Sequence, residues 1–199
     1  MRRLAQLTLL SGMMALVPAA AVSQEASLYT PGRYQVDATA TKAHFHVKAL
    51  VSSYEGDFVA PGGSVAIEES HPDRAIVDIR FPVDRLTTGD ASTDAMLKGD
   101  SFFDMTHFPT VRFEATDAPL ASAHAATPIA GQLTMHGQTH PVTVSIRLIG
   151  VTPDEARGPS MLHFAGTLTV DRSQFGMGFG RPFVSDRVDL TIDALFHRS

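Results

Sequence analysis

The feature that most constrains the fold is an alternation of apolar and polar residues that recurs along most of the chain. In the stretch AHFHVKA, Phe45 and Val47 fall on one side and His44, His46 and Lys48 on the other. This period of two is that of a β-strand, whose successive side chains point to opposite faces of a sheet. The same pattern elsewhere brings the predicted strands to about eight. The further segments are residues 54–69, 75–83, 111–115, 129–135, 142–148, 162–170 and 188–196.

The connections between these strands predict antiparallel pairing. The stretch MHGQTHP, which joins two of them, is far shorter than a parallel crossover requires. Strands with one apolar face form either a sandwich or a closed barrel. Hairpins that follow one another along the chain favour an up-and-down barrel, because closure leaves no sheet edge exposed. We therefore predict an all-β fold, an antiparallel β-barrel of about eight strands.

One short helix is predicted near residues 90–98, in GDASTDAMLKG. Asp90 can cap its first turn, Lys98 suits its last turn, and Gly99 can end it in the left-handed conformation. A helix this short is not stable alone and must dock on the barrel. It would be either a lid over one mouth or the cover of a small satellite core. The apolar residues available for docking are Met96, Leu97, Phe102 and Phe103.

The first 23 residues predict a secretory signal peptide. They begin with Arg2 and Arg3, continue with a short apolar run and end in small residues. We expect cleavage after Ser23, with cleavage after Ala21 as the alternative. The apolar run is shorter than the ~20 residues that span a bilayer, which disfavours an uncleaved anchor. The sequence thus predicts a signal peptide at 1–23, a flexible segment at 24–32, a barrel domain at 33–199, and export to the periplasm.

Composition excludes several function classes. The chain has no cysteine, which removes thiolate catalysis, cysteine-bound zinc and disulfides. Its net charge is −5, and no basic block is present. This balance argues against binding nucleic acid and against electrostatic docking on anionic lipid.

Several blocks, in order, resemble the YceI-like family of exported lipid- and polyisoprenoid-binding proteins. They are YQVDATATKAHFHVKAL, YEGDF, LTTGDASTDAMLKGDSFFDMTHFPTVRFEA, GQLTMHGQTHPVTV and VDRSQFG. The resemblance implies a lipocalin-like, eight-stranded antiparallel barrel whose long apolar interior holds an isoprenoid or fatty chain. It also implies that a homodimer is possible, as described for some members. The chain departs from the family at residues 93–97, which lack the usual helix arginine and histidine, and at MGFGRPF after VDRSQFG.

Together, pattern and resemblance predict a non-enzymatic carrier for a long apolar lipid, an isoprenoid quinone or polyprenyl lipid. No cofactor is expected beyond that bound lipid, and transient contact with a membrane or a membrane protein is expected. The residues predicted to line the barrel are Phe45, Val47, Val77, Ile79, Phe81, Phe113, Leu133, Phe164 and Leu168. Those predicted to shape the entrance are Phe102, Phe103, Phe175 and Phe179. Small inward residues such as Gly131 and Gly166 either leave room or let larger side chains interdigitate.

Two other functions are compatible with the sequence. His44 and His46 share one strand face, a spacing that can hold zinc, so a metal-dependent enzyme is one alternative. A barrel filled by side chains, acting as an envelope interaction or stress-related module, is the other.

Further polar residues are predicted to be structural. His163 lies on a polar strand face, and His136 and His140 flank a hairpin turn. Arg172 is expected to pair with Asp104 or Asp186. Gly176 is expected to let the chain turn. Asp171 and Ser173 are not expected to form part of a catalytic triad.

Overall fold

The structure is a computed structural model that describes residues 28–154 and 158–199. The predicted signal peptide, its cleavage site and residues 24–27 lie outside the described residues. Within them, no helix has the length and apolar character needed to cross a membrane.

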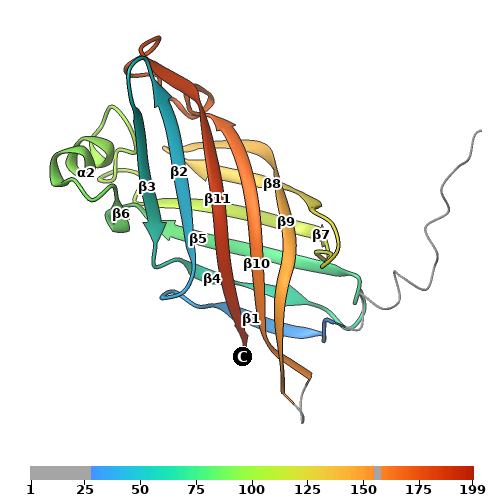
Figure 1. Cartoon of the computed structure of the whole chain (residues 1–199). Coiled ribbons are helices and arrows are strands. Elements are labelled where there is room, and N and C mark those ends of the chain that lie inside the picture. The colour runs from blue at the N-terminus through green and yellow to red at the C-terminus, as the bar shows by residue number, and fades with distance from the viewer. Residues whose placement is uncertain (1–27, 155–157) are drawn as a thin grey trace, which may run out of the picture.

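In the described part of the chain, eleven strand segments form one antiparallel sheet. They are β1 (Gly32–Val36), β2 (Lys42–Ala49), β3 (Ser53–Val59), β4 (Gly62–Ile67), β5 (Arg74–Pro82), β6 (Leu86–Thr87), β7 (Thr110–Pro119), β8 (Thr127–Met135), β9 (Gln138–Asp154), β10 (Gly158–Asp171) and β11 (Val184–Arg198). The helical segments among residues 28–154 and 158–199 are η1 (Val83–Arg85), α2 (Ala91–Lys98) and η2 (Arg172–Phe175). Figure 1 shows β3, β2, β11, β10 and β9 side by side, with β4, β5 and β7 crossing them on the far side.

The eleven segments occupy eight positions in a closed ring. β1 and β2 pair with successive parts of β11, so together they form one interrupted strand. β4 pairs with β1 and β3 pairs with β2, so β4 and β3 share the next position. β5 pairs with β4 and β6 pairs with β3, so β5 and β6 share the one after it. β7 to β11 then follow in chain order, and β1–β11 pairing closes the ring. The predicted eight-stranded, antiparallel, up-and-down barrel is therefore confirmed.

The first interruption is a turn built by short polar side chains. The Asp37 carboxylate accepts hydrogen bonds from the backbone N–H of Thr39 and Ala40, at 2.8 and 3.0 Å. The Thr41 hydroxyl donates to the carbonyl of Leu195 on β11 and accepts from its N–H. These bonds satisfy backbone groups that the broken ladder leaves unpaired. The wall can thus change direction between β1 and β2 without losing its link to β11.

Helix α2 begins as predicted and ends differently. The Asp90 carboxylate accepts a hydrogen bond from the N–H of Thr93 at 2.7 Å, which confirms the cap. The expected left-handed stop at Gly99 is wrong, because this residue is extended with φ −73°. The Gly99 N–H instead donates to the carbonyl of Met96, a tight last turn. The loop then turns back, and the Phe103 N–H donates to the carbonyl of Leu97 at 3.0 Å.

Candidate ligand-binding cavity

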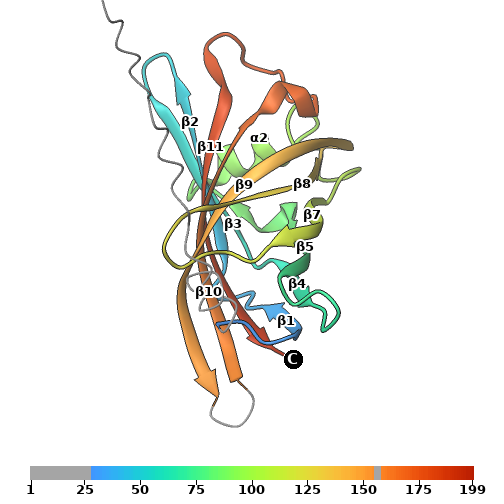
Figure 2. The same cartoon turned by 90° about the vertical axis from the view of Figure 1, so that its right-hand side faces the viewer.

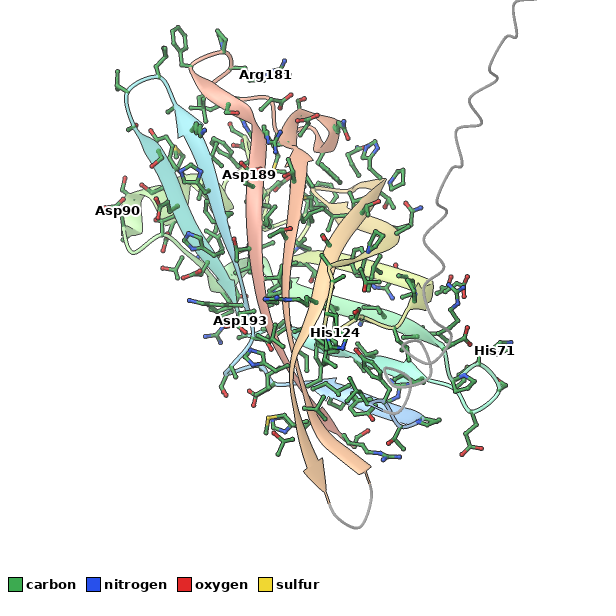
Figure 3. The ribbon with its side chains drawn as sticks, turned by 45° about the vertical axis from the view of Figure 1, so that its right-hand side comes forward. His71, Asp90, His124, Arg181, Asp189 and Asp193 are labelled. Carbon is green, nitrogen blue, oxygen red and sulfur yellow. The ribbon has the colours of Figure 1, made fainter. Side chains whose placement is uncertain are left out.

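The barrel encloses a cavity of about 380 Å³ that runs along its interior. Side chains from all eight strand positions line it, and nearly all are apolar. They alternate with outward polar residues, as Figure 3 shows for Asp189 and Asp193 on β11, whose side chains lie on the outer wall. Within the described lining there is no carboxylate and no histidine. The cavity therefore offers dispersion contacts and room for an apolar group.

Twelve of the thirteen residues predicted for the site line this cavity. They are Phe45, Val47, Val77, Ile79, Phe81, Phe102, Phe103, Phe113, Leu133, Phe164, Leu168 and Phe179. Phe175, expected at the entrance, lies elsewhere. The η2 turn directs it into an apolar cluster, where its ring packs edge-on against His140 at 5.0 Å between ring centres. Phe175 is 1% exposed and does not contact the cavity.

Inward glycines let the aromatic rings lie against the wall. A β-carbon placed on Gly131 would come within 2.5 Å of the Phe113 ring, and one on Gly56 within 2.6 Å of the Phe45 ring. Each ring therefore occupies the space that a side chain at the glycine would fill. Both expectations for the small inward residues therefore hold. Large side chains interdigitate with glycines along the wall, and the centre of the barrel stays open.

One end of the cavity is closed by buried residues. The ring of Tyr29 lies there, 7% exposed, and its hydroxyl donates to the carbonyl of Ala121 at 2.6 Å. Tyr29, Ala121 and Phe196 line the cavity and are all buried. Tyr29 lies in the segment 24–32, which the sequence predicts to be flexible, whereas Leu28, Tyr29 and Pro31 contact the barrel. The apolar pair Leu28 and Tyr29 just before β1 is the signal that could have identified this plug.

The other end is open and is shaped by α2 and two loops. Tyr54 on β3, Met96 on α2 and Phe179 before β11 line the cavity and are also at least 41% exposed. Side chains that meet both cavity and solvent mark the mouth. Helix α2 contributes Met96 to this mouth, and Figures 1 and 2 show the helix on the flank of the barrel, in the half away from the C-terminus. The reading of α2 as a cover for one mouth therefore fits its position.

The adjacent phenylalanines after α2 have different partners. The Phe103 ring packs edge-on against Phe58 at 5.4 Å between ring centres, inside the barrel. The Phe102 ring packs edge-on against Phe179 at 5.6 Å, at the mouth. Phe103 thus anchors the loop to the core, whereas Phe102 ties it to the segment before β11.

Arg172 supports the mouth from within the protein. Its guanidinium donates to the backbone carbonyls of Met177, Phe179, Val184 and Ser185. The residue as a whole is 5% exposed. Among the described residues, Arg172 forms no salt bridge with Asp104 or Asp186, because backbone carbonyls occupy its donors. The expected charge pairing is present only as the effect of the nearby Asp186 carboxylate on Arg172. The carboxylate of Asp186 instead accepts from the N–H and hydroxyl of Ser173, and that of Asp104 contacts His107.

Burial and nearby charges shift the pKa values of Arg172 and Asp186. Desolvation lowers the pKa of Arg172, and the nearby Asp186 carboxylate partly opposes that shift. The pKa of Asp186 is lowered overall: burial opposes the shift, while hydrogen bonds from Ser173 and the charge of Arg181 favour it. Gly176 adopts φ 81°, which confirms the predicted turn after η2.

The histidine pair lies on the outer wall, away from the cavity. His44 Nδ1 contacts the Asp57 carboxylate at 3.0 Å, and its Nε2 lies 3.8 Å from Glu55. His163 similarly contacts Asp193 across strands. In residues 28–154 and 158–199, no group of three or more His, Asp or Glu side chains is arranged to hold a metal ion.

These features define a small closed β-barrel with a deep apolar cavity open at one end. The model of the YceI-like domain matches residues 34–196, and the chain belongs to this family. A UPF0312 protein of Pseudomonas aeruginosa is 29% identical over 181 residues, covering 87% of this chain and 93% of the relative. One from Pseudomonas fluorescens is 27% identical over 141 residues, covering 69% and 71%.

Solved structures share the fold. BcnA of Burkholderia cenocepacia has a TM-score of 0.68 at 22% identity and covers 80% of this chain and 98% of its own. A polyisoprenoid binding domain from Saccharophagus degradans, implicated in plant cell wall breakdown, has a TM-score of 0.67 at 13% identity and covers 83% and 98%. The Campylobacter jejuni YCEI protein has a TM-score of 0.62 at 16% identity and covers 76% and 89%.

Proposed function

We propose that this protein is a non-enzymatic periplasmic carrier for one long apolar lipid chain held along the barrel axis. The observation that supports this most directly is the cavity itself: its lining is almost wholly hydrocarbon and extends from the mouth to Tyr29. A volume of about 380 Å³ lies at the lower end of the ~300–1,000 Å³ usual for ligand pockets. One slender chain suits that space better than a broad, compact ligand.

Apolar contact is sufficient for useful affinity. Burying ten methylene groups contributes about 8 kcal/mol at about 0.8 kcal/mol each. Association costs of at least about 4 kcal/mol oppose this gain. The ligand must therefore be a long chain, because a short one would not offset the cost of association.

The chain, and not the head group, is the recognised part of this ligand. Arg172, the charged residue of the described lining, gives its donors to backbone carbonyls. Residues 93–97 also lack the arginine and histidine usual on the family's helix. We assign the ligand to isoprenoid quinones or polyprenyl lipids, a class suggested by the polyisoprenoid binding domain of the same fold. Such a carrier would load by transient contact with a membrane or membrane protein, and a homodimer stays a prediction.

The direct test is chemical analysis of what the purified protein contains and takes up. Organic extracts of the protein are examined by mass spectrometry, and uptake of a fluorescent farnesyl probe is then measured. We expect an isoprenoid lipid in the extract and saturable probe uptake. An extract without lipid, together with no probe uptake, would overturn the proposal.

A pair of variants locates the binding site within the barrel. Leu168 is 8% exposed and lines the cavity, whereas its neighbour Thr167 points outward. Leu168→Trp should abolish probe uptake, because the larger side chain fills the lumen, and Thr167→Trp should retain it. Equal uptake by both would place the ligand outside the barrel interior.

A further inference from the structure

The mouth end of the barrel carries an apolar surface outside the cavity. Leu50 and Val51, at the turn between β2 and β3, are 72% and 97% exposed. Phe179 and Phe183, in the loop before β11, are 61% and 64% exposed. We call these four side chains the tip surface. Figure 2 shows the two loops projecting past the barrel at the end opposite the C-terminus.

The tip surface is held by backbone contacts, so its exposure is built into the fold. The Leu50 N–H donates to the carbonyl of Phe183 at 3.0 Å, which joins the two loops. Beneath them, the Arg172 guanidinium donates to the carbonyls of Phe179 and Val184. Large apolar side chains presented in this way to solvent are unfavourable unless a partner covers them.

The charges around the tip surface indicate what covers it. Residues 48–54 and 176–184 contain Lys48 and Arg181 and no carboxylate, in a chain with 21 acidic residues. The Asp186 carboxylate lies 3.6 Å from the Arg181 guanidinium, which remains 50% exposed. Arg181 lies at the tip in Figure 3, while Asp90, Asp189 and Asp193 lie further along the barrel. Long cationic side chains next to apolar ones suit a bilayer interface, where the cation meets phosphate and the apolar group enters the acyl region.

Geometry favours a bilayer over a second copy of the chain. A stable interface between proteins buries about 800 Å² on each partner and requires complementary surfaces. The tip surface consists of four side chains on two projecting loops, a shape suited to shallow insertion into a fluid phase. Phe179 belongs both to the tip surface and to the cavity mouth. A ligand leaving the mouth would therefore pass directly into whatever covers the tip surface.

We propose that the tip surface inserts into the surface of a phospholipid bilayer and points the cavity mouth at the lipid phase. This proposal rests on the carrier function above and specifies the surface through which the carrier loads. Insertion is driven by apolar burial, with Lys48 and Arg181 at the level of the phosphates, so the overall negative charge of the chain does not prevent it. Binding should persist in about 1 M salt, where electrostatic screening acts over about 3 Å.

The test is flotation of the full chain with vesicles of phosphatidylethanolamine and phosphatidylglycerol. The variant V51S/F183S removes two apolar side chains of the tip surface without changing the cavity lining. Its vesicle affinity should fall at least about tenfold, since burying one such side chain is equivalent to a factor of ten or more. The matched control I76S/I149S removes two exposed apolar side chains from the barrel wall, 39% and 45% exposed, and should float like the wild type.

Each outcome decides for or against the proposal. Flotation of V51S/F183S equal to that of the wild type, or no flotation of the wild type, would overturn it. A wild-type dimer in sedimentation that V51S/F183S converts to monomer would also overturn it, by assigning the tip surface to a second copy. Uptake of the farnesyl probe from solution separates the two proposals: uptake without flotation contradicts only docking, and flotation without uptake contradicts only the carrier function.

Discussion

Val77 and Ile76 are neighbours on β5 whose side chains point to opposite sides of the barrel wall. Val77 lines the cavity, whereas Ile76 is 39% exposed on the outside. The chain contains no tryptophan, so a single introduced indole reports on its own surroundings. Val77→Trp should lower farnesyl-probe affinity at least about tenfold by filling the lumen, and should emit at shorter wavelength than Ile76→Trp. Fluorescence titration of both variants checks this, and equal affinities would contradict it.

Asp37 makes the stability of the barrel depend on pH. Its carboxylate accepts hydrogen bonds from Thr39, Ala40 and His197, which lower its pKa well below the ordinary value of 3.8. The folded chain thus keeps this group ionised at a pH where the unfolded chain binds a proton. The resulting stabilisation is complete above pH 3.8 and is lost as the pH falls from there towards the folded-state pKa.

The expected result for Asp37→Asn is lower stability at neutral pH and a weaker loss of stability on acidification below about pH 4. Urea denaturation across that pH range measures both effects. Asp117→Asn is the control, because the Asp117 side chain is 78% exposed. Parallel stability curves for Asp37→Asn and the wild type would show that the turn after β1 is not held by this carboxylate.

Helix α2 is the element least fixed by burial. None of its residues is fully buried, and Leu97 and the following Phe103 are its links to the core. We therefore expect its amides to exchange hydrogen much faster than those of β10, because local opening exposes little apolar surface. Asp90→Ala should speed this exchange further, since the N–H of Thr93 loses the carboxylate that caps it.

Ligand loading should slow exchange in α2, because Thr93, Met96 and Leu97 line the mouth. Hydrogen-exchange mass spectrometry before and after loading with the farnesyl probe measures the change. Unchanged exchange in α2, with slower exchange at the Tyr29 end alone, would place the ligand away from the helix.

The sequence alone was sufficient to predict the strands wherever apolar and polar residues alternate strongly. The segments at 75–83, 162–170 and 188–196 correspond to β5, β10 and β11, because the pattern of side chains is fixed by which face meets the interior. The breaks that divide three strand positions were not predictable in the same way. They depend on contacts with distant strands, as the bond between Thr41 and Leu195 shows.

Dependence on contacts that are distant in the sequence also explains the wrong predictions at individual positions. Gly99 is a glycine just after a helix, the usual residue for a left-handed C-terminal stop. Its backbone is extended instead, because the loop that follows turns back so that the Phe103 N–H bonds to the carbonyl of Leu97. Phe175 is an aromatic residue close to the barrel end, which suggested a place at the mouth, but the η2 turn directs its side chain into the core. Tyr29 was missed because its partner, the carbonyl of Ala121, is 92 residues away in the chain.

The whole molecule is asymmetric along the barrel axis. Tyr29 and its neighbours close one end, while α2 and the tip surface surround an open mouth at the other. A barrel of eight strands has an interior wide enough for one small ligand at most. In this one, inward glycines hold aromatic rings against the wall and keep the centre free. Shape, lining and mouth together suit a single chain that enters end first.

Native mass spectrometry of the intact protein, loaded with a polyprenyl probe, tests this account most directly. The wild type and Ile76→Trp should each carry one noncovalently bound probe per chain, and Val77→Trp should carry none. A probe bound equally by all three, or by none of them, would mean that the barrel interior does not hold the lipid.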